Sequence, residues 1–356
     1  MKNEKETVFV GLSGGVDSSV AALRLLKQGY FVVGVFIKVW QPDWLKCNWE
    51  EERLDAMRVA AKLKIPFLTC DSEQAYKQEV ADYFINEYKQ GRTPNPDVMC
   101  NKYVKFGSFL DFAKKHGADY VATGHYARKI PFETKVGSYL GRGADNNKDQ
   151  SYFLWTLTKD QIEKILLPVG DSTKAEIRQE AKKAGLLTSD KKDSQGVCFL
   201  GHIDIAEFLS HYIDLKTGDV LNEAGAKIGQ HKGAIIYTTG QRHGFEVFNK
   251  EADSEPQYVI NRDIISNTIT VSNQKPTLER KNIRLNDCSW VNEPPKVGQE
   301  YYIQTRYRQT PVLATVESTI DNQVKLKVDN TTDEPTAGQS CVLYNDHICI
   351  GGGIIS

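Results

Sequence analysis

An aspartate and a cysteine lie close together in the segment GRTPNPDVMCNKYVKFG, and their types suit acid–base and thiol chemistry. Asn95 is a good helix N-cap and Pro96 a good first helical residue, so a helix is expected to begin here. Asp97 and Cys100 are then neighbours on one helix face. The helix start and two nearby lysines favour the thiolate of Cys100. The alternative is a cysteine that packs inside and an aspartate that only favours the helix start.

A second cysteine, Cys198, follows a polar loop in the segment KKDSQGVCFLG. A cysteine on a mobile loop can visit a site and leave it. The alternative is that VCFL begins a buried strand, in which case Cys198 is structural. On these residues alone, both interpretations stay open.

The stretch SGGVDSS stands between a strand-like apolar run at 8–12 and a helix that is expected to start at Asp17. Such a loop gathers backbone N–H groups and the positive end of a helix, and this arrangement binds phosphate. Gly14 and Gly15 let the backbone approach a ligand closely. Asp17 and Ser18 are expected to cap the helix. The loop is neither a Walker A motif nor GxGxxG, and it carries no lysine.

The first half of the chain alternates strand and helix signals, which predicts a parallel sheet with helices on both faces. A ligand of such a sheet is expected at the carboxyl ends of its strands. The predicted strands cover 8–12, 30–40, 67–71 and 118–127, and the predicted helices cover 17–28, 50–64, 73–89 and a segment through 115.

The second half has a different character. A hairpin is predicted over 135–157, followed by a helix whose start has the capping-box spacing of Thr173 and Glu176. Gly185 is a suitable stop for that helix. From Asn282 to the end, short alternating strands predict a small antiparallel barrel.

The composition fits a globular protein of two or three domains, because 356 residues exceed one compact core. No apolar stretch reaches the length of a membrane span, and the N-terminus lacks a targeting pattern, so a cytoplasmic protein is expected. The net charge of −1 neither demands nor forbids a nucleic-acid partner. The seven cysteines include no CxxC pair, which argues against a zinc ribbon or a disulfide scaffold, and no protein metal site is predicted.

The sequence resembles known families at several motifs. SGGVDSS resembles the PP-loop of ATP pyrophosphatases, which grips the pyrophosphate part of ATP. Over nearly its whole length, from residue 11 to 353, the chain resembles the tRNA-specific 2-thiouridylases. The matching segments are GLSGGVDSSVAA, GRTPNPDVMCNKYVKFG, ATGHYAR, GRGADNNKDQSYFL, SQGVCFLG, TTGQRHG, RYRQ and GQSCVLYNDHICIGGG.

The resemblance implies an α/β fold with three parts. These are a PP-loop domain of the adenine nucleotide α-hydrolase-like type with a parallel sheet over 1–205, a small central domain over 206–275, and a tRNA-binding antiparallel β-barrel over 276–356. A monomer with no membrane partner is expected.

The activity implied by the resemblance is sulfur insertion at carbon 2 of the wobble uridine, with Lys, Glu and Gln tRNAs as expected substrates. ATP would adenylate the uracil oxygen and make it a good leaving group. Cys198 would carry sulfur as a persulfide received from a sulfur-relay protein or a cysteine desulfurase. Cys100 would either release that sulfur as sulfide or resolve an adduct as a Cys100–Cys198 disulfide. Asp97 would be a general acid or base.

The resemblance also assigns binding residues. ATP, with Mg²⁺ neutralising its phosphates, is expected at Gly11, Leu12, Ser13, Gly14, Gly15, Val16, Asp17, Ser18, Ile37 and Gly124. Contact with tRNA is expected at Asn95, Pro96, Asp97, His125, Lys148, Asp149, Gln150, Arg306, Tyr307 and Gln339.

Some of these positions have plainer interpretations. His125 also suits a hydrogen-bonded histidine at a strand end, and Arg306 with Tyr307 also suits an ordinary barrel strand. Ile37 stands where the family is expected to have methionine, so its contact with adenine would rest on backbone and shape. Cys47 lacks the family's expected surroundings and is interpreted as structural.

Rival functions remain at this point. Another PP-loop enzyme that adenylates a small carboxylate would explain the loop but leave Cys100, Cys198 and the barrel without a role. A nucleotide-binding RNA adaptor or sulfur carrier would bind tRNA without releasing AMP. Thiolation of a different nucleotide is a third possibility within the enzyme class.

Overall fold

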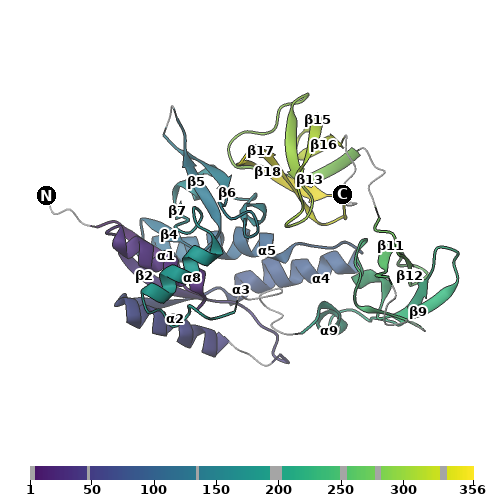
Figure 1. Cartoon of the computed structure of the whole chain (residues 1–356), viewed down its shortest axis with the longest axis horizontal. Helices are drawn as coiled ribbons and strands as arrows, with labels where there is room; N and C mark the ends of the chain where they lie inside the picture. The colour runs from purple at the N-terminus through teal and green to yellow at the C-terminus, as the bar shows by residue number, and fades with distance from the viewer. Residues whose placement is uncertain are drawn as a thin grey trace.

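The computed structural model of the chain has an α/β part, a smaller central β part and a C-terminal barrel (Figure 1). The barrel lies beside the α/β part, and the helix that ends in α4 reaches toward the central part. The structure describes residues 5–45, 49–133, 136–192, 203–248, 255–276, 282–328 and 335–356. Within these ranges, no helix combines the length and apolarity that crossing a bilayer requires.

The first sheet has five parallel strands in the order β3-β2-β1-β4-β7. Alternate residues of β1 serve opposite cores, because side chains alternate across a strand. Val8 and Val10 join one buried cluster, and Phe9 joins the other. The bounds are β1 Thr7–Gly11, β2 Phe31–Lys38, β3 Phe67–Asp71, β4 Tyr120–Ala122 and β7 Ile165–Leu166.

Helices cover both faces of this sheet, as the alternation of strand and helix signals predicted. The cluster around Val8 and Val10 includes residues of α1, α2 and α8, and the cluster around Phe9 includes residues of the helix that ends in α6. The bounds are α1 Val16–Lys27, α2 Trp49–Leu63, α3 Glu73–Tyr76, η1 Lys77–Ala81, α4 Asp82–Lys89, α5 Pro96–Met99, η2 Cys100–Ser108, α6 Phe109–Lys115, α7 Lys159–Glu163 and α8 Lys174–Lys183.

The predicted helix boundaries are largely confirmed. Two helical runs cover 73–89 and 96–115, each with an internal π-helical stretch, η1 and η2. Helix α8 begins with the predicted capping box of Thr173 and Glu176, and Gly185 follows it at φ +64°. These local signals were strong because each rests on side-chain-to-backbone bonds within one turn.

The central part is a five-stranded sheet in the order β10-β9-β8-β12-β11, with β8 and β12 parallel and the other pairs antiparallel. Its buried side chains share one cluster with α4, so the helical run and the small sheet pack together. The bounds are α9 Ile205–Ser210, β8 Gly218–Leu221, β9 Lys227–His231, η4 Ala234–Ile236, β10 Phe245–Val247, β11 Tyr258–Asp263 and β12 Thr268–Ser272.

The C-terminal strands form the predicted antiparallel barrel, in the order β13-β16-β15-β14-β17-β18, and pairing of β13 with β18 closes it. Strand β18 also pairs with β6, so a hairpin of the α/β part extends the barrel's sheet. The bounds are β5 Ala127–Pro131, β6 Ser138–Arg142, β13 Asn282–Trp290, β14 Glu300–Gln304, β15 Val312–Ile320, β16 Gln323–Val328, β17 Ser340–Asn345 and β18 Ile348–Ile355.

The hairpin predicted over 135–157 is wrong in its pairing. Strand β6 pairs with β5, which precedes it, and residues 151–153 form a short 3₁₀ helix. The carboxylate of Asp149 accepts hydrogen bonds from the backbone of Gly143 and Ser151 at 2.9 and 3.0 Å, which turns the chain away from β6. The strand predicted over 118–127 is likewise divided into β4 and β5.

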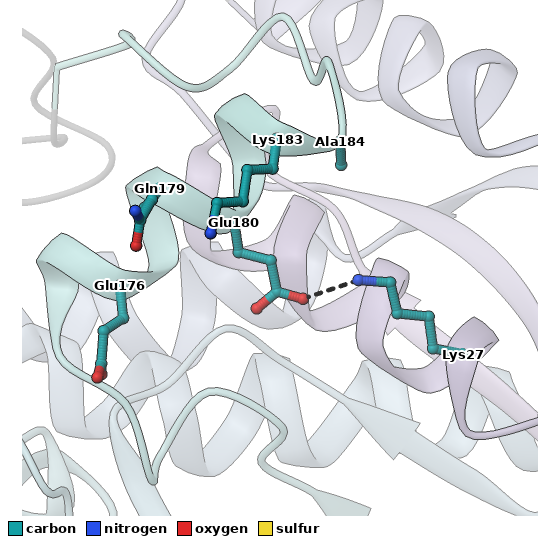
Figure 2. A pocket seen from close by; sticks show the side chains of 6 residues that line it. All are labelled: Lys27, Glu176, Gln179, Glu180, Lys183 and Ala184. Carbon is teal, nitrogen blue, oxygen red and sulfur yellow. Dashed lines mark hydrogen bonds and ion pairs between the residues drawn. The ribbon is translucent and has the colours of Figure 1, made fainter.

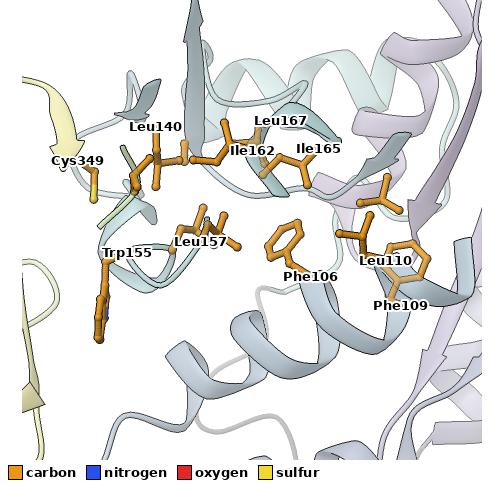
Figure 3. Close-up of a cluster of buried hydrophobic side chains, with 14 of the residues drawn as sticks. Phe106, Phe109, Leu110, Leu140, Trp155, Leu157, Ile162, Ile165, Leu167 and Cys349 are labelled. Carbon is orange, nitrogen blue, oxygen red and sulfur yellow. The ribbon is translucent and has the colours of Figure 1, made fainter. Parts of the chain in front are cut away.

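One apolar core joins the α/β part to the barrel. Figure 3 shows Phe106, Phe109 and Leu110 of the helical run with Trp155 and Cys349 at the barrel end of the same cluster. The indole N–H of Trp155 donates to the Ser340 hydroxyl at 3.1 Å. The barrel is therefore packed against the helix that carries Cys100.

Candidate active site

The glycine-rich loop lies at the carboxyl edge of the sheet, between β1 and α1. Gly14 has φ +69°, and Gly15 is the N-cap residue with no side chain to accept from the first-turn amides. The hydroxyls of Ser18 and Ser19 donate to the Gly15 carbonyl at 3.2 and 2.7 Å. The prediction that Asp17 and Ser18 cap the helix is therefore wrong, because both side chains have other partners. The uncapped amides suit an anion.

Close packing holds the loop in place. A Cβ added to Gly124 would lie 2.6 Å from the Ser18 nitrogen, so only glycine fits against the loop here. A Cβ on Gly14 would lie 2.8 Å from the Asp55 Cβ. A Cβ on Gly11 would lie 3.5 Å from the Ile37 side chain. The structure thus brings Gly11, Ile37 and Gly124 together with the loop, as expected of a nucleotide site.

Sequence reasoning missed a lysine at this loop. The Lys174 ammonium lies 2.8 Å from each carboxylate oxygen of Asp17, and the Tyr126 hydroxyl donates to the same carboxylate at 2.7 Å. Lys174 is the first residue of α8, and its backbone N–H donates to Asp145 at 3.0 Å. The capping box predicted the helix start, but no local signal predicted which loop it faces.

A surface hollow between α1 and α8 lies apart from the predicted site residues (Figure 2). Two of its charged groups pair across the two helices, since Glu180 accepts from Lys27 at 3.2 Å, and Glu180 also accepts from Arg24 of α1 at 2.9 Å. We interpret this hollow as the seam that fixes α8 on α1, and thereby Lys174 at the loop. Its lining residues are Lys27, Glu176, Gln179, Glu180, Lys183 and Ala184.

The helix that carries Asp97 and Cys100 begins as predicted. The Asn95 side chain accepts from the Val98 N–H at 3.4 Å, and Pro96 is in the first turn. Cys100 follows α5 directly and is 5% exposed. It also begins the π-helical stretch η2, a geometry that is frequent at functional sites.

The Lys105 ammonium lies within electrostatic reach of two buried titratable groups, Asp97 and His125. Burial raises the pKa of Asp97, and the Lys105 ammonium opposes that rise. Burial lowers the pKa of His125 well below its ordinary value, and Lys105 lowers it further. A neutral imidazole and a carboxyl that is readily protonated are suited to proton transfer.

His125 has the hydrogen bond expected of a strand-end histidine. Its Nδ1 lies 2.7 Å from the Thr123 hydroxyl, and its ring centroid lies 5.8 Å from that of Phe106. The side chain is buried. Its contact with tRNA stays a prediction.

The segment KDQ, at 148–150, makes hydrogen bonds to the backbone next to the candidate site. The Gln150 amide oxygen accepts from the Tyr126 N–H at 2.9 Å, and the Gln150 N–H donates to the Tyr126 carbonyl at 2.8 Å. Asp149 is buried and bonded to the backbone at Gly143 and Ser151. Lys148 is half-buried. The contacts of Asp149 and Gln150 are thus structural, and their contact with tRNA stays a prediction.

Arg306 and Tyr307 follow β14 in a turn, so the interpretation as ordinary strand residues is wrong. The Arg306 guanidinium donates to the Thr239 carbonyl at 2.7 Å and to the Thr336 hydroxyl at 3.1 Å, which joins the central part to the barrel. The ring centroid of Tyr307 lies 4.6 Å from that of Phe153.

The segment that precedes Asn95 is bonded to the barrel. The Gln339 amide nitrogen donates to the carbonyls of Thr93 and Pro94 at 2.9 and 3.2 Å. The Thr93 N–H donates to the Ala337 carbonyl at 2.9 Å. Gln339 therefore lies beside the helix that carries Cys100, although the two are far apart in the sequence.

The remaining cysteines divide into two groups. Cys198 and Cys47 lie outside the described residues, so the persulfide role of the first and the structural role of the second stay predictions. Burial raises the pKa of Cys70, raises that of Cys288 and Cys349 to about 12 and raises that of Cys341 further, which suits inert core thiols. Among the described residues, no group of three or more His, Cys, Asp or Glu side chains forms a metal site.

Comparison with known proteins identifies the class to which these three parts belong. The family described as "tRNA methyl transferase HUP domain" matches residues 6–202, its "PRC-barrel domain" counterpart matches 206–273, and "Aminomethyltransferase beta-barrel domain" matches 280–355. A parallel-sheet HUP domain, a PRC-barrel-like part and an antiparallel barrel confirm the predicted fold class.

Relatives that match over nearly the full length of the chain identify the family within this class. The tRNA-specific 2-thiouridylase MnmA of Proteus mirabilis (strain HI4320) is 42% identical over 99% of this chain and 98% of its own length. The proteins of the same name from Shewanella piezotolerans and Escherichia coli O139:H28 are 43% and 42% identical, over 98% and 100% of this chain and 95% and 98% of their own lengths. The chain belongs to the tRNA-specific 2-thiouridylase family. The domain descriptions refer to methyl transfer, but the relatives match all three parts together and therefore weigh more.

Proposed function

We propose that this protein inserts sulfur at carbon 2 of the wobble uridine of tRNA and consumes ATP. The observation that carries the proposal is the neighbourhood of the phosphate-type loop and Cys100. The Ile37 side chain packs both against the position of Gly11 and in the buried cluster that contains Cys100. The family identity supports the reaction. A synthetase for small carboxylates would leave this cysteine and the barrel without a role.

The first step makes the uracil oxygen a leaving group. The oxygen on carbon 2 attacks the α-phosphorus of ATP, an O–P bond forms, and the bond from the α-phosphorus to the bridging oxygen breaks to release pyrophosphate. The uncapped amides of the loop would hold the phosphates, and Gly11, Ile37 and Gly124 would form the nucleotide pocket. The Lys174 ammonium would supply the cation that the loop itself lacks.

The carboxylate of Asp17 fits a supporting role toward a magnesium ion. It is held at the start of α1, and among the described residues no group of three or more His, Cys, Asp or Glu side chains could hold a metal ion. Mg²⁺ commonly binds through one or two carboxylates and the substrate phosphates. Bound with ATP, the ion would neutralise charge on the phosphates.

The second step delivers sulfur, which Cys198 would carry as a persulfide. In one route the Cys100 thiolate attacks the Cys198 sulfur, forms a disulfide and releases sulfide, which attacks carbon 2 and displaces AMP. In the other route the terminal sulfur attacks carbon 2, AMP leaves, and Cys100 attacks the Cys198 sulfur to free the thiocarbonyl. Either route ends in a Cys100–Cys198 disulfide that a thiol reductant must reopen. Burial raises the pKa of Asp97. This carboxyl group would act as general acid or base toward the uracil ring.

The substrate would be tRNA with Lys, Glu or Gln acceptors, and the sulfur would come from a relay protein or a cysteine desulfurase. Arg306, Tyr307 and Lys148 are the polar and aromatic groups we assign to RNA contact, because phosphate pairing and base stacking need these side chains. Asn95, Pro96 and His125 would surround the target base.

The test is nucleoside mass analysis of unmodified wobble-uridine tRNA after incubation with the protein, ATP, Mg²⁺ and a persulfide source. We expect 2-thiouridine with the wild type and none with Cys100→Ala or Cys198→Ala. Cys288→Ala, which removes a buried barrel thiol, is the matched control and is expected to keep the product. AMP formation without sulfur incorporation by the wild type would refute thiolation and direct the search to other adenylated substrates.

A further inference from the structure

Residues 91–95 lead directly into the helix that carries Asp97 and Cys100, and the two other parts of the molecule hold them. The Thr93 hydroxyl lies 2.9 Å from the Thr238 hydroxyl of the central part. The Thr93 N–H donates to the Ala337 carbonyl of the barrel end at 2.9 Å. The segment is therefore a junction of all three parts.

The Gln339 side chain makes the closest link at this junction. Its amide nitrogen donates to two successive carbonyls, Thr93 at 2.9 Å and Pro94 at 3.2 Å. The segment contains Pro94 and is followed directly by Pro96, and neither residue has an N–H group to donate. A single side chain of the barrel thus orients the two peptide groups that precede the helix cap.

The backbone around Gln339 is itself fixed. The Gly338 N–H donates to the Ile355 carbonyl at 2.9 Å, and the Ile355 N–H donates to the Gln339 carbonyl at 2.8 Å. Gly338 has φ +90°, and a Cβ there would lie 2.9 Å from the Thr93 oxygen. The two backbones are in direct contact, so a shift of one must move the other.

We propose that Gln339 is a positioning residue that holds Asp97 and Cys100 in their working geometry through residues 93–95. The inference rests on the proposed function, since it concerns the helix that would carry out sulfur transfer. It differs from the RNA contact that family resemblance assigns to Gln339, because the amide nitrogen is committed to the protein. The barrel then has two roles, RNA binding and support of the catalytic helix.

Two variants separate positioning from RNA contact. Gln339→Met keeps the length of the side chain but donates no hydrogen bond, whereas Gln339→Lys still donates. We expect the Met variant to lower the single-turnover thiolation rate at saturating tRNA and ATP about tenfold, with tRNA Kd unchanged within about twofold. The Lys variant is expected to recover much of the rate. Gln323→Met, at an exposed glutamine of the same barrel, is the control.

A weaker tRNA Kd with an unchanged saturating rate would overturn the proposal and leave Gln339 as an RNA contact. Thermal denaturation of each variant identifies any loss of folding. If the Met variant unfolds, the thiolation rate of the Lys variant is compared with that of the wild type instead. A Lys variant with no better rate than a folded Met variant also counts against positioning by donation.

A second readout needs neither ATP nor tRNA. Cys100 is 5% exposed, so its alkylation by iodoacetamide, followed by peptide mass mapping, reports how firmly the helix start is held. We expect alkylation about fivefold faster in Gln339→Met than in the wild type or Gln323→Met. An unchanged rate would overturn the proposal. Absence of 2-thiouridine with the wild type would instead refute the proposed function, and the alkylation result would still test the support of the helix.

Discussion

The phosphate-type loop and the segment 91–95 both position reactive groups, but their backbones are held in different ways. The Gly15 carbonyl of the loop accepts from Ser18 and Ser19 within the loop, and distant residues reach the loop through its side chains, as Tyr126 and Lys174 do at Asp17. The segment is bonded to residues 145 and 246 positions away, at Thr238 and Gln339. A loop whose backbone carbonyl is bonded within the loop can keep its backbone shape when distant parts of the chain change. A segment held from outside depends on how three parts are assembled, so chemistry at Cys100 should be more sensitive to distant changes than nucleotide binding.

Gly124→Ala gives the largest expected effect, and it tests whether the close packing of Gly124 against the loop fixes the shape of the loop. The new methyl group would meet the Ser18 nitrogen at 2.6 Å, and this backbone atom cannot move aside without shifting the loop. We expect ATP conversion to AMP to fall about 100-fold. Gly11→Ala is the comparison, because its Cβ would meet Ile37 at an ordinary 3.5 Å. Equal activity of the two variants would contradict the packing argument.

Lys174→Ala tests the one long-range charge at the loop. Removal of the ammonium leaves the Asp17 carboxylate facing the phosphates without its cationic partner, so we expect kcat/KM for ATP to fall about tenfold or more. Lys182→Ala, at an exposed position of the same helix, should leave this value within about twofold. A normal KM and kcat in the Lys174 variant would remove this residue from the nucleotide site.

A pH experiment tests the buried groups at the catalytic helix. The pKa of His125 in the folded protein lies well below the ordinary 6.5, so the unfolded chain binds a proton first as the pH falls. The free energy of unfolding should then decrease below pH 6.5, by about 1.4 kcal/mol per pH unit. His125→Asn should lack this component. The measurement is denaturant unfolding of both proteins between pH 7 and 5, and parallel curves would refute the prediction.

Thr93→Val gives the smallest expected effect and tests the segment from its central side. The change removes the hydroxyl bond to Thr238 but keeps both backbone bonds to the barrel. We expect the activation free energy of thiolation to rise by about 1 kcal/mol, which lowers the thiolation rate about fivefold, with AMP formation unchanged. A larger loss in AMP formation than in thiolation would break the contrast between the two regions.

The sequence predicted features that depend on neighbours in the chain. The strand–loop–helix order around Gly14, the cap at Asn95 and the capping box at Thr173 were all recognisable, because their bonds span a few residues. The barrel strands were recognisable because apolar and polar residues alternate along each strand, a pattern that also lies within a few neighbouring residues. Family resemblance supplied what these patterns could not, namely the reaction and the roles of Cys100 and Cys198.

Features that depend on distant contacts were not predictable from residue patterns. Nothing near Lys174 in the sequence indicates that its ammonium reaches Asp17, which lies 157 positions away. The sequence prediction paired β6 with the segment after it, although β6 pairs with β5. The chain turns away after β6 because the buried Asp149 carboxylate binds the backbone there, and no turn residues indicate this. Aspartate is a common helix-capping residue, but the Asp17 carboxylate instead binds the Lys174 ammonium.

The pairing of β6 with β18 has a mechanical consequence. A strand of the α/β part continues the barrel's own sheet, so the boundary between them is bridged by backbone pairing, and we expect no hinge there. With Trp155 packed across the same boundary, we expect these two parts to unfold as one cooperative unit. We therefore expect tRNA to bind without a swing of the barrel relative to the α/β part, so that the RNA changes shape and presents an unstacked uridine.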